Sequence, residues 1–196
     1  METKDHYSLS RLLARRMKLN FPKSLAFTLG NVFPDLNLLS YLKGASAADL
    51  DGHTYQARRN LMSRTYSSEF RDTLQGWFHA GEMMHYIADS FTRPHNKEFK
   101  FSFPQHVLYE RRLHSVFRKT MRPEQILRPA KPVMDIRRFD PWMETLHERY
   151  LLSSSAPEDD CRYILRSSLA VCSSLTAKCT GQKPQPEQSG QVRLGF

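Results

Sequence analysis

Hydrophobic residues along this chain recur mostly at the three- and four-residue spacing of amphipathic helices, whereas the alternation typical of strands is rare. Near the start, one helix face is formed by His6, Leu9, Leu13 and Met17. The strongest pattern runs over residues 68–91, where a single stripe is formed by Phe70, Leu74, Trp77, Phe78, Gly81, His85, Ala88 and Phe91. We therefore predict an all-α fold.

Two further helices are predicted in the second half of the chain. One begins near Pro104, and its buried face is formed by His106, Glu110, Leu113 and Phe117. The last begins at a capping box in residues 155–158 and ends near Gly181. Its apolar stripe includes all three cysteines, so we expect Cys161, Cys172 and Cys179 to be small core residues rather than ligands.

Prolines mark the predicted interruptions between these helices. A proline-containing break is predicted at residues 31–37, followed by a short helix through Leu39 and Tyr41. Three prolines predict an extended connection over residues 121–140.

The length of 196 residues suits one domain, which we assign to residues 1–180. Residues 181–196 are polar and rich in Gln, Pro and Gly, which predicts a flexible, disordered tail. No uncharged apolar run reaches the roughly 18 residues of a transmembrane segment. Charged residues interrupt the first twenty positions, so no secretory signal is evident, and we expect a cytoplasmic protein that could associate peripherally with a membrane. Three cysteines without a closed disulfide framework agree with a reducing compartment.

The formal net charge of +9 and the pI near 9.6 bear on the partner. A basic surface suits nucleic acid, an anionic membrane surface or a phosphate-bearing substrate equally well, and basic residues also serve solubility alone. The charge therefore does not choose among these partners.

Candidate chemistry lies in two pairs of ionisable residues on helix faces that otherwise look buried. His85 precedes Asp89 by four residues, and His106 precedes Glu110 by four, so each pair projects from one side of a helix. A carboxylate on an apolar face is costly unless it is paired or bound to a metal. For these pairs, metal binding and an ordinary structural role are about equally expected. The small Gly81 beside His85 is expected to leave room for an ion.

Other candidates lie at helix or loop boundaries, where side chains can be directed into a cleft: His6, Asp35, His53 and His95. Taken singly, His6 and His53 are more often ordinary histidines, and Asp35 could only cap the next helix. The remaining histidines, at positions 79, 114 and 147, do not clearly join the set. Several common metal and nucleotide motifs are absent: the chain has no His-Glu-x-x-His, no Cys-x-x-Cys and no phosphate-binding loop. Both candidate pairs run His first and carboxylate fourth, which is the reverse of the Glu-x-x-His pairs of di-iron bundles.

The order of these residues resembles the zinc-dependent phospholipase C family, whose architecture is related to that of the fungal single-strand nucleases. The resemblance spans about residues 6–118, and it is most specific in His85-Tyr-Ile-Ala-Asp89 followed by His95 and then His106-x-x-x-Glu110. It implies an all-α fold, two or three zinc ions and hydrolysis of phosphodiesters.

The resemblance also implies a role for each candidate. One zinc would be held by Asp35, His53, His85 and Asp89. A second would be held by His95, His106 and Glu110. Asp89 would bridge to a third ion that His6 helps to bind. Secreted members begin with a Trp whose amino group and carbonyl bind this third zinc, and no Trp lies near the start of this chain.

We accordingly expect a metal-dependent phosphodiester hydrolase in which Asp35 orients or deprotonates the attacking water. The substrate is expected to be a phosphodiester, with a phospholipid at a membrane surface as the leading candidate. One alternative is a nuclease, with bases stacked on Trp77, Phe91, Phe101 and Phe103. Another is a non-catalytic helical module that metals only stabilise.

Overall fold

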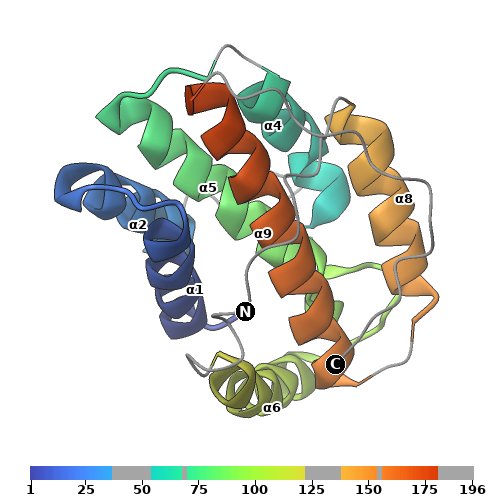
Figure 1. The fold of residues 1–196 in the computed structure, drawn as a ribbon. Helices are drawn as coiled ribbons and strands as arrows, with labels where there is room; N and C mark the ends of the chain where they lie inside the picture. Colours follow the sequence, from blue (N-terminus) through green and yellow to red (C-terminus); the bar gives the residue numbers. More distant parts are fainter. Residues whose placement is uncertain (37–53, 68–69, 122–137, 154–155, 181–196) are drawn as a thin grey trace.

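The computed structural model describes residues 1–36, 54–67, 70–121, 138–153 and 156–180. These residues form seven α-helices and one short 3-10 helix, and they contain no strand (Figure 1). The elements in chain order are α1 (Thr3–Arg16), α2 (Phe21–Leu36), α4 (Tyr55–Ser67), α5 (Leu74–Ser90), η1 (Arg93–His95), α6 (Phe103–Thr120), α8 (Phe139–Leu151) and α9 (Pro157–Thr180). The prediction of an all-α fold is confirmed. The predicted short helix near Leu39 and the tail of residues 181–196 lie outside the described residues.

Helix α5 is the central element of the fold. It packs against α2, α4 and α9, and Figure 1 shows α1 and α2 on one side of it with α4 and α8 on the other. All of residues 83–90 are buried, so this end of α5 is enclosed on every side. His85 and Asp89 therefore lie in the interior of the protein, among apolar neighbours such as Met84 and Ile87.

Two glycines allow α2 and α5 to approach each other closely. A Cβ atom at Gly30 would collide with the carbonyl oxygen of Phe78, and one at Gly81 would collide with that of Phe27. The close approach leaves no space beside Gly81, which corrects the expectation that this residue makes room for an ion. Its role is to bring the helix that carries His85 against α2.

The predicted break at residues 31–37 is wrong, because α2 continues through Pro34 to Leu36. A proline in the last turn removes one backbone hydrogen bond, and packing against α5 offsets that loss. Asn31 contributes to this packing by donating a hydrogen bond from its side chain to the carbonyl of Gly81 at 3.2 Å. Continuation of the helix is what brings Asp35 toward α5.

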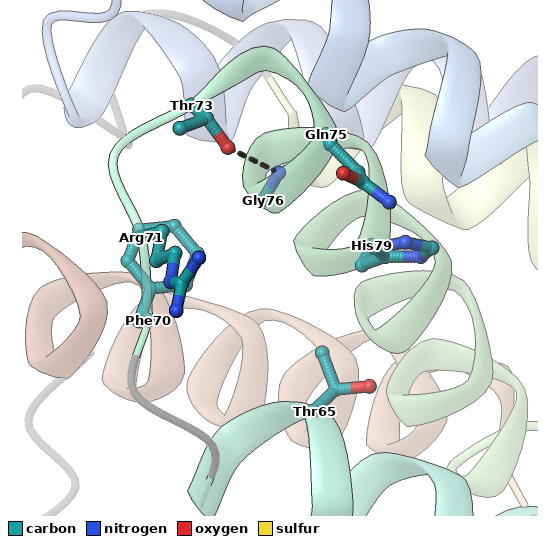
Figure 2. Close-up of a pocket in the computed structure, with 7 residues that line it drawn as sticks. All are labelled: Thr65, Phe70, Arg71, Thr73, Gln75, Gly76 and His79. Atoms are coloured by element: carbon teal, nitrogen blue, oxygen red, sulfur yellow. Dashed lines mark hydrogen bonds between the residues drawn. The ribbon is translucent and has the colours of Figure 1, made fainter.

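Several helix boundaries also differ from the sequence pattern. Helix α5 begins at Leu74 rather than near residue 68, because the side chain of Thr73 accepts a hydrogen bond from the Gly76 amide at 3.1 Å and caps the helix (Figure 2). Two helices, α4 and α8, were not predicted. The start of α6 at Phe103 and the range of α9 agree closely with the prediction.

The cysteines lie where the helical stripe predicted. Cys161 and Cys172 are buried, Cys179 is partly buried, and all three are free thiols on α9. No helix in the described part of the chain is both long and apolar enough to cross a bilayer.

The buried His147 on α8 makes the stability of the fold depend on pH. The ring of His147 stacks on Tyr55 with centroids 4.2 Å apart, and its Nε2 atom donates a hydrogen bond to the side-chain oxygen of Asn96 at 2.7 Å. Burial lowers the pKa of His147 to about 4. The imidazole is therefore neutral in the folded protein at neutral pH.

This burial predicts a stability that falls with acidification. Between about pH 6.5 and pH 4 the unfolded chain binds a proton at His147 that the folded protein does not, so the free energy of unfolding decreases as the pH falls through this range. The contribution of His147 to the slope is at most about 1.4 kcal/mol per pH unit. Urea unfolding at pH 7, 6 and 5 should show a shallower dependence in His147→Gln than in the wild type. Equal pH dependence of the free energy of unfolding in both proteins would contradict the lowered pKa of His147.

Candidate metal centre

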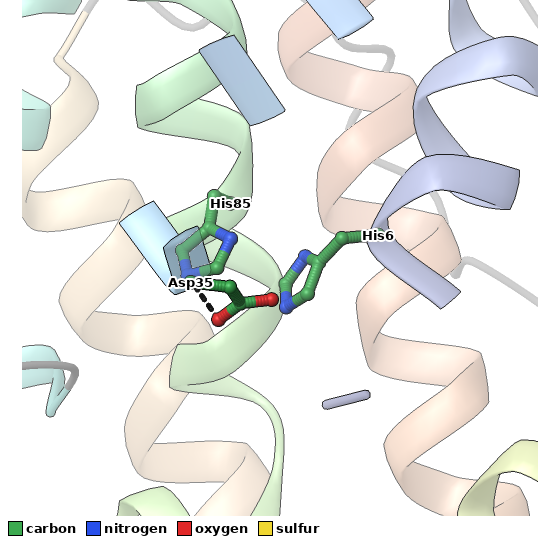
Figure 3. A group of neighbouring side chains, drawn as sticks. All are labelled: His6, Asp35 and His85. Carbon is green, nitrogen blue, oxygen red and sulfur yellow. Dashed lines mark ion pairs between the residues drawn. The ribbon is translucent and has the colours of Figure 1, made fainter. Parts of the chain in front are cut away.

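Two groups of ligand-type side chains lie where α1, α2, α5, η1 and α6 meet. The first consists of His6 on α1, Asp35 on α2 and His85 on α5, with one ligand atom of each lying within 4.8 Å of the others (Figure 3). Nε2 of His85 lies 3.7 Å from Oδ1 of Asp35. The rings of His6 and His85 stack with centroids 3.9 Å apart. Three helices that are separate in the sequence thus direct these side chains to one place.

The second group consists of His95, His106 and Glu110, whose ligand atoms also lie within 4.8 Å of one another. Oε1 of Glu110 lies 3.3 Å from Nε2 of His95 and 3.2 Å from Nε2 of His106. The one-turn spacing on α6 aligns His106 with Glu110, and η1 turns the chain after α5 so that His95 faces both.

Asp89 lies between the two groups. Its Oδ1 atom is 3.1 Å from Nε2 of His6 and 3.9 Å from Nε2 of His95, while its Oδ2 atom is 3.2 Å from Nε2 of His85. One carboxylate therefore contacts a residue of each group, which is the geometry that a bridging ligand requires.

The structure brings together seven of the eight residues that the sequence singled out as ligands: His6, Asp35, His85, Asp89, His95, His106 and Glu110. The eighth, His53, lies outside the described residues. His79 and His147 lie elsewhere, as expected. His114 forms an ion pair with the buried Asp5, and with Glu2 these residues make a separate group of possible ligands.

The amino group of Met1 also lies at this centre, which the sequence pattern did not predict. Its nitrogen is buried, 3.0 Å from Oδ1 of Asp89, 3.1 Å from Oε1 of Glu110 and 3.2 Å from Nε2 of His95. Burial alone would lower the pKa of this group, but Asp89 and Glu110 outweigh burial and raise it to about 11. A positive charge is thus stabilised between the buried Asp89 and the partly buried Glu110.

The ring of His85 is oriented by a backbone carbonyl. Its Nδ1 atom donates a hydrogen bond to the carbonyl oxygen of Asn31 at 2.9 Å, so Nε2 is the ring nitrogen that faces Asp35 and Asp89. Metal-ligating histidines commonly donate their second ring nitrogen in this way. The orientation of His85 is therefore the one that a metal ligand would need.

Burial and neighbouring charges keep His6 neutral and Glu110 ionised at neutral pH, which are the forms in which these side chains bind metals. Burial, reinforced by the neighbouring His85, lowers the pKa of His6 to about 4. Burial works against ionisation of Glu110, but the Met1 ammonium, His106 and His95 lower its pKa below the usual range. The imidazole is consequently neutral and the carboxylate charged, as metal coordination requires.

The donor set fits zinc. Imidazole nitrogens and carboxylate oxygens are common zinc ligands, and the buried cysteines of α9 do not join the described groups. Oδ2 of Asp35 is buried without a hydrogen-bond partner among the described residues, and so is Nδ1 of His6. An unpartnered buried carboxylate oxygen is costly, and a cation would offset that cost.

The chain matches the family model of zinc dependent phospholipase C over residues 5–156. This protein belongs to the zinc dependent phospholipase C family. The matched range includes all eight predicted ligands. No curated protein and no solved structure matches the chain.

A pocket elsewhere, at the start of α5, is lined by Thr73, Gln75 and His79 among others and contains none of the candidate ligands (Figure 2).

Asp160, which lies beyond the matched range, supports the second ligand group. This fully buried residue in the first turn of α9 accepts hydrogen bonds from the Arg93 amide at 3.1 Å and from the hydroxyls of Tyr109 at 2.8 Å and Tyr150 at 2.9 Å. Arg93 begins the 3-10 helix that ends at His95, and Tyr109 directly precedes Glu110 on α6. A single carboxylate therefore ties together both elements that carry the second group.

We predict that Asp160→Asn weakens zinc binding by the second ligand group, because an amide cannot accept all three of these hydrogen bonds. Loss of such an orienting contact lowers metal affinity by about 10–100-fold. Zinc content and affinity, measured by mass spectrometry and chelator competition, report the effect. Asp159→Asn is the matched control, since that neighbouring carboxylate pairs with Arg162 instead. An Asp160→Asn protein that binds zinc as tightly as this control would contradict the proposed role.

Proposed function

We propose that this protein is a zinc-dependent phosphodiester hydrolase that cleaves phospholipids in the manner of a phospholipase C. The observation that carries the proposal is the convergence of ligand side chains from five separate elements, with Asp89 in contact with members of both groups. Membership of the zinc dependent phospholipase C family supports the same conclusion.

The ligands of two zinc ions follow from the two groups. We assign Asp35, His85 and Asp89 to one ion, with His53 as a further predicted ligand. We assign His95, His106 and Glu110 to the other. A third ion would take His6 together with Asp89, so the proposed cluster has two or three ions.

Zinc bound in such a site lowers the pKa of water to about 7 and stabilises negative charge on phosphate oxygens. The chain itself contributes the acceptor for the proton. Oδ2 of Asp35 is buried and has no hydrogen-bond partner among the described residues, so it can accept a proton from the water that attacks phosphorus. Attack breaks the bond between phosphorus and the oxygen of the leaving alcohol, and that oxygen takes up a proton as the phosphomonoester forms.

The aromatic residues considered for base stacking give little support to a nuclease. Trp77 and Phe91 are buried, and Phe91 stacks on Tyr163 with ring centroids 5.7 Å apart. Neither ring is free to receive a base. Phe101 packs edge-on against Tyr109 with ring centroids 5.4 Å apart. Phe103 is therefore the one exposed ring among the four candidates, and one ring does not form a stacking surface.

We predict that Asp35→Asn retains bound zinc, because the amide oxygen can still coordinate the ion. The variant should hydrolyse phosphatidylcholine in mixed micelles at least about 100-fold more slowly, because the amide cannot accept the proton. Phosphate released after phosphatase treatment measures the rate. Asp72→Asn is the control, since this carboxylate lies on the surface and pairs with Lys23. Unchanged hydrolysis by Asp35→Asn at full zinc content would contradict the role of Asp35.

Two other outcomes would contradict the proposal itself. Hydrolysis of single-stranded DNA without hydrolysis of the phospholipid would identify a nuclease. Full zinc loading without hydrolysis of either substrate would identify a metal-stabilised helical module.

A further inference from the structure

Helix α2 presents an unusual outer face. Its five large exposed residues are all apolar and between 43% and 79% exposed: Phe21, Leu25, Leu29, Phe33 and Leu36. They recur every three or four positions and so form one stripe along the helix, which we call the α2 stripe. The remaining exposed residue of α2, Pro22, is also apolar. The solvent-facing side of α2 therefore carries no exposed polar side chain.

The opposite face of α2 is already used for packing. It lies against α5 through Phe27, Gly30 and Asn31, all of which are buried. A helix that is apolar on both faces is typical of a position covered on both sides. Among the described residues, only one side of α2 is covered. The pattern indicates that something else contacts the α2 stripe when the protein functions.

The charges nearby indicate the nature of this contact. Helix α1 packs against α2, and the exposed charged residues among positions 1–36 are all basic: Lys4, Arg11, Arg15 and Lys18. Of the three acidic residues of this segment, Asp5 is buried against His114, Asp35 faces His85, and the partly buried Glu2 pairs with Lys4. Apolar residues beside a basic, non-acidic surface are typical of helices that lie in the interface of an anionic bilayer.

The α2 stripe is also joined directly to the candidate metal centre. Asp35 lies on the same helix, between Phe33 and Leu36, and its carboxylate faces His85. A surface seated on the stripe would thus hold phospholipid headgroups close to the end of α2 that carries Asp35. A second copy of the chain would also cover the stripe. In that case the basic residues of α1 would meet the equally basic residues of the other copy, and their charges would remain without complementary partners.

We propose that the α2 stripe, together with the basic surface of α1, docks on an anionic phospholipid membrane. The inference rests on the proposed function, because a hydrolase of phospholipids must reach a substrate held in a bilayer. It adds a specific surface and a specific lipid charge to that function. Leucine and phenylalanine side chains supply apolar burial at the interface, and the arginines of α1 supply attraction to anionic headgroups.

Sedimentation with vesicles tests this docking separately from catalysis. Zinc-loaded protein in the Asp35→Asn background is mixed with vesicles of phosphatidylcholine alone or with one quarter phosphatidylserine. We expect Leu25→Ser/Leu29→Ser to bind the anionic vesicles at least about tenfold more weakly, because two apolar side chains no longer enter the interface. Leu61→Ser/Leu152→Ser is the matched control, since these leucines are exposed on α4 and at the end of α8, and it should bind normally.

A second pair of variants tests the charge. Arg11→Gln/Arg15→Gln should bind anionic vesicles about tenfold or more weakly, with less dependence on salt, and should be unchanged on neutral vesicles. Circular dichroism and thermal unfolding establish that each variant is folded. Equal vesicle binding by the α2 and control leucine variants would overturn the proposal.

Two further measurements separate the competing outcomes. Light scattering measures the oligomeric state of both proteins. A wild-type dimer that Leu25→Ser/Leu29→Ser reduces to a monomer, with no vesicle binding by either protein, would overturn the proposal. That result would identify a second copy of the chain as the partner of the α2 stripe. With Asp35 restored, the stripe variant should hydrolyse a small soluble phosphodiester at the control rate but vesicle lipid more slowly. Absence of hydrolysis with normal, stripe-dependent vesicle binding would contradict the proposed function and leave the docking surface supported.

Discussion

The structure depends on the compensation of negative charge at Asp89 and Glu110. Asp89 is 1% exposed and lies on the most enclosed part of α5. Burial of a carboxylate costs several kcal/mol unless positive charge or strong hydrogen bonds offset it. Imidazoles from α1, α5 and η1 and the amino group of Met1 surround this carboxylate. The elements of the fold are arranged so that one buried anion is contacted from several sides, and a cluster of divalent cations would satisfy the same requirement more completely.

The two groups of candidate ligands are held in place in different ways. The first group depends on contact between helices, because the glycines at positions 30 and 81 bring α2 against α5 and the Asn31 carbonyl orients His85. The second group depends on a buried polar network, in which Asp160 joins η1 and α6 to α9. Burial raises the pKa of Asp160 to about 6 despite its hydrogen-bond donors. The two halves of the centre can therefore respond differently to substitution.

Much of this centre could be predicted from the sequence because helical spacing is local. The four-residue separation placed His85 beside Asp89 and His106 beside Glu110, and the structure confirms both contacts. The contribution of Asp160 could not be predicted, since a carboxylate in the first turn of a helix is usually an exposed partner of the helix dipole. The course of α2 was missed because Pro34 suggested a break, whereas tertiary packing keeps the helix intact. Periodicity shows which residues share a face, but it does not show whether that face is covered, and so the α2 stripe emerged only from the structure.

The most direct test is an anomalous-scattering map at the zinc absorption edge, from crystals of the full chain grown with zinc. We expect at least two peaks, one beside Asp35, His85 and Asp89 and one beside His95, His106 and Glu110. The opposite result would be a map without zinc at either position, in crystals where these side chains point apart into solvent. It would show that these residues do not form a metal centre.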